Sequence, residues 1–113
     1  MFGVYFRHKK SMDYLMKCHF KLWTEFLIKN KNIDFIQYVE EHKSNYEFNN
    51  HLLRDIKKGL IKKVWIPDIS VFNENIMENF LLLCKAKNID FYINDKIADI
   101  DLLYDNLIIK TVF

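Results

Sequence analysis

The chain has 113 residues, enough for one domain with a single hydrophobic core. Half of the residues are hydrophobic, with ten Phe, six Tyr and two Trp among them, and this composition excludes intrinsic disorder. The net charge of +2 is too small for a strongly basic nucleic-acid-binding surface. No apolar run has the length of a signal peptide or a membrane span, so we expect a cytosolic protein with no membrane contact.

Neither the cysteines nor the histidines are spaced like metal ligands. Cys18 and Cys84 each fall within an apolar helical pattern, which is typical of buried thiols in a reducing compartment. We therefore expect no metal and no cofactor. One turn gathers basic residues, which we interpret as a solvated surface with a phosphate contact as the alternative: Lys57, Lys58, Lys62 and Lys63.

The predicted elements alternate between strand and helix from the start of the chain. A short apolar run over residues 3–6 predicts the first strand, and apolar residues at helical spacing predict a helix over residues 11–29. Residues 33–39 are rich in Ile, Phe, Tyr and Val and predict the second strand. A short helix over residues 49–58 follows and ends at Gly59.

The second half of the chain continues the alternation. Residues 64–66 predict a strand covered on both faces, in which we expect Trp65 to be buried. Asn73 or Asn75 opens the next helix, and residues 89–93 predict the fourth strand.

Three helix terminators recur at equal intervals along the sequence: Asn30, Gly59 and Asn88. Each interval accommodates one strand and one crossover helix, which indicates an α/β fold. Parallel strand pairing with right-handed crossovers is the default for such a chain.

Residues 59–95 resemble the middle of the catalytic domain of serine recombinases, the resolvase and invertase family. In that family a helix ends in glycine, an apolar strand follows, and a loop then leads into a long helix and a further strand. Here the strand 64–66, the loop 68–74 and the elements after it fit this frame without gaps. Residues 3–9 resemble the family's first strand, and residues 35–45 resemble its second strand with the acidic, serine-containing loop.

The resemblance implies the fold and its limits. We expect an α/β, three-layer domain with a mainly parallel four-stranded sheet in the order two, one, three, four, and helices on both faces. We expect this single domain to cover residues 1–113 and to lack the long dimerisation helix and the DNA-binding domain of the family. Any DNA binding by the domain alone is therefore expected to be weak.

The departures from the family fall on its chemistry. The nucleophilic serine of the family aligns with Lys9, and three of its arginines align with Tyr46, Val71 and Glu74. Attack on a phosphodiester places negative charge on oxygens that positioned cations must stabilise. We therefore expect no strand cleavage and a vestigial site, in which three residues still match the family by type: Arg7, Ser44 and Ser70.

Two of the candidate residues have competing interpretations. Ser11 would become the nucleophile if the first loop were shifted by two residues, but a serine at the start of a helical pattern is typically its cap. Arg7 can bind a phosphate, or it can pair with Glu40, Glu41 or Asp68.

A second class of function is an enzyme that uses acids at the carboxyl ends of the strands, where ligands bind in open α/β sheets. Such acids hold divalent ions in small metal-dependent nucleases and phosphatases. Helix capping and loop solvation are the competing roles of acids at these positions. The residues expected at this edge are Arg7, Lys9, Glu40, Glu41, Asp68, Ser70 and Asp95.

The tail, residues 99–113, is strongly apolar and is compatible with either a helix or a strand. An apolar surface at a chain end predicts an interface, so we expect a homodimer or a complex with another protein through this segment. The alternative is that the tail folds back over the sheet. The partner is expected in a DNA recombination or mobile-element context.

Overall fold

Strands and helices alternate along the residues that the computed structural model describes, which are 1–8, 13–41 and 46–112. The elements in chain order are β1 (Phe2–Arg7), α1 (Asp13–Lys29), β2 (Phe35–Glu40), α2 (Glu47–Lys57), β3 (Lys63–Ile66), the short 3-10 helix η1 (Ile69–Val71), α3 (Glu74–Lys87), β4 (Asp90–Ile93), β5 (Lys96–Ile97) and α4 (Ile100–Val112).

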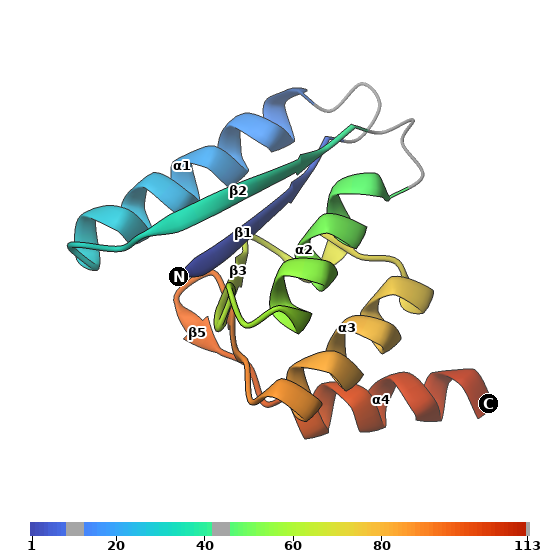
Figure 1. The fold of residues 1–113 in the computed structure, drawn as a ribbon. Helices are drawn as coiled ribbons and strands as arrows, with labels where there is room; N and C mark the ends of the chain where they lie inside the picture. The colour runs from blue at the N-terminus through green and yellow to red at the C-terminus, as the bar shows by residue number, and fades with distance from the viewer. Residues whose placement is uncertain (9–12, 42–45, 113) are drawn as a thin grey trace.

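The strands form one sheet in the order β2-β1-β3-β4-β5 (Figure 1). The first four are parallel, which confirms the predicted order two, one, three, four. The four-stranded expectation omitted β5, which pairs antiparallel with β4 through two residue pairs. Asn94 adopts a left-handed conformation (φ 56°) and closes the turn between them. A strand of two residues is too short to leave a periodic pattern in a sequence.

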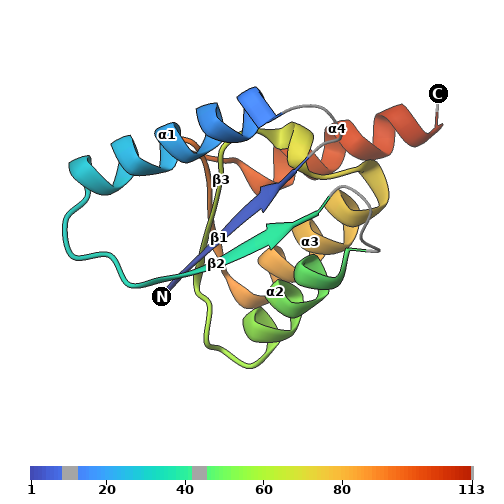
Figure 2. The same cartoon turned by 90° about the horizontal axis from the view of Figure 1, so that it is seen from above.

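Helix α1 covers one face of the sheet, and α2 and α3 cover the other, with α4 against α3 (Figures 1 and 2). On the α1 side, Trp23 and Phe26 of the helix pack on the strands. Trp65 is fully buried there, as the sequence predicted. This layer of the core comprises Phe2, Val4, Phe6, Met16, Trp23, Phe26 and Trp65.

The opposite layer is built where α2 approaches β1 closely. A Cβ atom on Gly3 would lie 2.7 Å from Leu52 Cδ1 and 3.1 Å from Ile61 Cγ2, so glycine allows the helix to pack directly on the strand. The buried residues of this layer include Tyr5, Leu52, Ile56, Val64, Ile66, Phe80, Leu81 and Phe91.

The tail forms a helix rather than a strand, because α4 runs from Ile100 to Val112. Ile100, Leu103 and Leu107 are half-buried against the α2–α3 layer, so one face of the tail folds back on the domain. Leu102 points outward and is 58% exposed. No helix in the described part of the chain is both long and apolar enough to cross a membrane.

The helix ends follow the predicted signals with one correction. The Asn73 side chain accepts a hydrogen bond from the Ile76 N–H (2.9 Å) and caps α3, and Asn88 ends it in a left-handed conformation. Gly59, with φ 80°, ends α2. After α1 the left-handed residue is Asn32 (φ 65°) and not Asn30. The Asn30 side chain instead donates to the Phe26 carbonyl (3.0 Å).

Candidate functional site at the carboxyl ends of the strands

The carboxyl ends of β1 and β2 bring two charged residues together. Arg7 is the last residue of β1, Glu40 is the last of β2, and the two are register partners. In open α/β sheets this edge is where ligands bind. The structure therefore places Arg7 and Glu40 side by side at the expected edge.

Glu40 is fully buried and is held by hydrogen bonds from two elements. Its Oε2 accepts from the Tyr5 hydroxyl (3.3 Å) and from the Asn49 backbone N–H (3.0 Å). Asn49 lies in the first turn of α2, whose N–H groups have no partner within the helix. A carboxylate there also interacts favourably with the helix dipole. Glu40 thus anchors the start of α2 to the sheet.

The same carboxylate affects Tyr5. Burial, and then the negative charge of Glu40, raise the pKa of the Tyr5 hydroxyl well above its usual value, while Arg7 opposes the rise. Tyr5 therefore stays protonated and donates its hydrogen to Glu40. This arrangement favours a fixed hydrogen-bond donor over a proton-transfer group.

Arg7 lies against an aromatic ring. Its Cζ is 3.9 Å from the centroid of the Tyr46 ring, within the range of a cation–π interaction. Its Nη1 is buried and has no hydrogen-bond partner among the described residues, and the same holds for Asn49 Nδ2. Tyr46 therefore covers the guanidinium with an aromatic ring.

Tyr46 is held in place on both sides. Its backbone is left-handed (φ 60°, ψ 34°), a conformation that a bulky residue rarely adopts. Its hydroxyl accepts a hydrogen bond from Asn73 Nδ2 (2.9 Å) at the start of α3. The sequence analysis aligned Tyr46 with an arginine of the resembled family and assigned it no contact. No local pattern signals this conformation, which depends on β1 and α3.

The loop after β3 supplies caps. Asp68 Oδ1 accepts from the Ser70 backbone N–H (2.8 Å), and both residues are exposed. Val71 is buried in the core. Ser11, Ser44 and Lys9 lie outside the described residues, so their predicted roles stay predictions.

The acids proposed for a metal-dependent enzyme do not all gather at this edge. Glu40 accepts hydrogen bonds from Tyr5 and Asn49, and Asp68 accepts one from Ser70. Asp95 lines a hollow together with residues near the end of α1, including Lys29 and Asn30. Within residues 1–8, 13–41 and 46–112, no three His, Cys, Asp or Glu side chains are placed to hold a metal ion.

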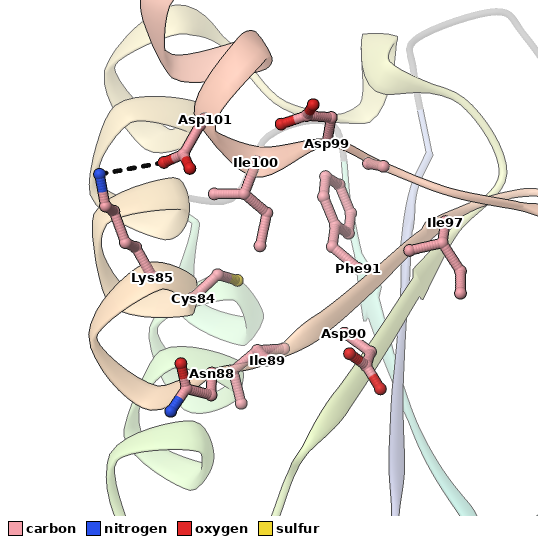
Figure 3. Close-up of a pocket in the computed structure, with 11 residues that line it drawn as sticks. Cys84, Lys85, Asn88, Ile89, Asp90, Phe91, Ile97, Asp99, Ile100 and Asp101 are labelled. Carbon is pink, nitrogen blue, oxygen red and sulfur yellow. Dashed lines mark ion pairs between the residues drawn. The ribbon is translucent and has the colours of Figure 1, made fainter.

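A cavity of about 400 Å³ lies elsewhere, at the amino end of β4 between α3 and the start of α4 (Figure 3). Lys85 Nζ forms an ion pair with Asp101 Oδ1 (3.0 Å) across it. Burial raises the pKa of the Cys84 thiol in its wall to about 12, which makes that thiol a poor nucleophile. None of the predicted site residues lines this cavity.

The similarity of this chain to a known protein was found in its structure and not in its sequence. No protein-family model and no curated protein matches the chain. Among solved structures, it is similar to a resolvase family site-specific recombinase from Streptococcus pneumoniae, with a TM-score of 0.78 and 18% identity over 98% of this chain and 85% of that chain. The chain has a resolvase-like fold.

The alignment predicted from the sequence puts three arginines of the resembled family at Tyr46, Val71 and Glu74, all of them described residues and none of them a cation. Tyr46 covers Arg7, and Val71 is buried in the core. Of the residues that match the resembled family by type, Arg7 ends β1 and Ser70 lies in η1 after β3, and their predicted roles stay predictions.

Proposed function

We propose that this resolvase-like domain does not cleave DNA and acts through protein–protein contacts in a DNA recombination or mobile-element context. The observation that carries the proposal is the Tyr46 ring, 3.9 Å from the Arg7 guanidinium. In the alignment predicted from the sequence, this neutral ring stands at a position where the resembled family has an arginine.

The energetic argument concerns the charge that develops during cleavage. A pentacovalent phosphate needs several donors aimed at its oxygens, and removing one such donor typically costs about 10²–10³ in rate. At this edge the buried Glu40 carboxylate and the exposed Asp68 add negative charge. Arg7 alone does not offset both carboxylates and a phosphate.

The proposed contact surface is the tail, residues 99–113. Since Ile100, Leu103 and Leu107 pack inward, the outer face of α4 with the exposed Leu102 is the part available to a second copy or another protein. Weak DNA binding is compatible with this arrangement, because the chain carries a net charge of only +2.

The test of the proposed loss of cleavage is a search for a covalent protein–DNA adduct. The purified chain in excess is incubated with supercoiled plasmid and with labelled duplex fragments, quenched with detergent and resolved on denaturing gels, beside an active resolvase with its own site. We expect no adduct and no nicking. An adduct that disappears in Ser11→Ala would overturn the proposal and identify Ser11 as the nucleophile. Tyr46→Arg provides a gain-of-charge variant for the same assay.

A further inference from the structure

Strand β2 forms one border of the sheet. It pairs with β1 along its whole length, and no other described strand lies on its far side (Figure 2). A border strand of six residues presents a row of free backbone groups, which is a template for pairing with another chain.

The backbone hydrogen bonds show which groups are free. The carbonyls of Asp34 and Glu40 accept from Phe2 N (2.9 Å) and His8 N (2.8 Å) on the β1 side. Because neighbouring residues of a strand point their N–H and C=O groups in opposite directions, Phe35, Gln37 and Val39 direct theirs to the open edge.

This edge lacks the features by which border strands usually avoid pairing. Residues 35–39 read Phe-Ile-Gln-Tyr-Val, with neither a charged residue nor a proline. Four of the five are aromatic or β-branched, the types that favour extended structure.

The side chains next to the edge are partly uncovered. Phe35 and Phe20 are each 37% exposed, and Val39 is half-buried. A mainly apolar hollow of about 450 Å³ is lined by Met16, Phe20 and Val39, with His8 and Glu41. Helix α1 packs on Phe2, Phe6 and Trp65, and its Trp23 also contacts the Phe35 ring (centroids 5.2 Å apart), so the helix covers the β2 side of this face only in part.

We propose that β2 pairs antiparallel with β2 of a second copy of this chain, about a twofold axis at Gln37. Phe35 then lies opposite Val39 of the second copy, and Gln37 opposite its own equivalent, and each such pair can exchange two backbone hydrogen bonds. Ile36 lies opposite Tyr38 of the second copy. The occupant is a second copy because the stretch is self-complementary, with apolar side chains opposite apolar ones and an amide opposite an amide.

This surface is distinct from the tail, so the inference goes beyond the proposed function. A single strand pair with its flanking side chains falls at the small end of specific interfaces. The expected dissociation constant is on the order of 10–100 µM.

The test is sedimentation velocity of the full chain up to about 500 µM, repeated for Gln37→Lys and Gln37→Glu. Each variant places like charges opposite one another across the axis, so each alone is expected to weaken the dimer about tenfold or more. An equimolar mixture of the two restores it, because lysine then faces glutamate. The mixture can restore the dimer only if both variants are folded. Far-ultraviolet circular dichroism of each variant checks its folding.

Two matched controls separate this surface from others. Asn79→Lys adds the same charge at an exposed position of α3 and is expected to leave the dimer unchanged. Leu102→Lys changes the outer face of α4. A chain that stays monomeric at the highest concentration overturns the inference. A dimer that is insensitive to Gln37→Lys also overturns it, and if Leu102→Lys abolishes that dimer, the tail is the interface. Neither result bears on the adduct assay.

Discussion

Truncating Trp65 to alanine tests the layer of the core that α1 forms. Trp65 is fully buried, and its ring centroid lies 4.9 Å from that of Trp23, 5.9 Å from Phe6 and 6.0 Å from Phe26. Removing a large aromatic side chain from such a site costs about 3–5 kcal/mol of the free energy of unfolding. That is a large share of the roughly 5–15 kcal/mol typical of a domain.

A second variant at the same position isolates the energetic cost of the unpaired indole N–H. The Trp65 Nε1–H is buried and has no hydrogen-bond partner among the described residues. Trp65→Phe removes this unpaired donor, whose burial costs about 1–3 kcal/mol, and keeps an aromatic ring. The gain offsets part of the lost burial, so we expect a net loss below about 1.5 kcal/mol.

The assay for both variants is urea denaturation followed by far-ultraviolet circular dichroism. The dependence of the free energy of unfolding on urea concentration should be the same as in the unchanged chain, which confirms that the same cooperative transition is measured. A loss below about 1 kcal/mol for Trp65→Ala would place the strand at an exposed edge and refute the packing argument. A loss above about 1.5 kcal/mol for Trp65→Phe would show that burying the unpaired indole N–H costs little.

Three further outcomes follow from the site and the cysteines. Asn73→Ala removes both the cap of α3 and the donor to the Tyr46 hydroxyl, and is expected to cost about 1–2 kcal/mol in urea denaturation, against about 1 kcal/mol for Tyr46→Phe. Iodoacetamide is expected to label the half-buried Cys18 well before Cys84, as peptide mass spectrometry would show; equal rates would contradict the burial of Cys84. Between about pH 9 and 12 the folded chain keeps the Cys84 proton that the unfolded chain releases, so stability falls as pH rises, and Cys84→Ala should reduce this slope.

The main elements were predictable because their signals are local. The Asn73 cap and the left-handed Gly59 and Asn88 depend on a few neighbouring residues, and the structure has each at the expected helix end. The uninterrupted apolar run around Trp65 required cover on both faces, which only a central strand provides. The order of the strands came from the family frame and not from these local patterns.

The site was less predictable because its contacts join distant segments. The sequence placed Arg7 and Glu40 at one edge, as successive parallel strands require. It gave no indication that Glu40 would accept from Asn49 at the start of α2, or that Tyr46 would cover Arg7. The contact with Arg7 involves a left-handed tyrosine, a conformation that no short pattern records.

Both tryptophans of the chain lie in the same layer, and their ring centroids are 4.9 Å apart. Intrinsic tryptophan fluorescence will therefore report the docking of α1 on the sheet and will be insensitive to the α2–α4 side, whose buried phenols are Tyr5 and Tyr38. Fluorescence thus reports one layer of the core, whereas far-ultraviolet circular dichroism of the same sample reports the helices of both layers. If their midpoints coincide, the two layers unfold as one cooperative unit. If they separate, α1 detaches before the rest of the domain unfolds.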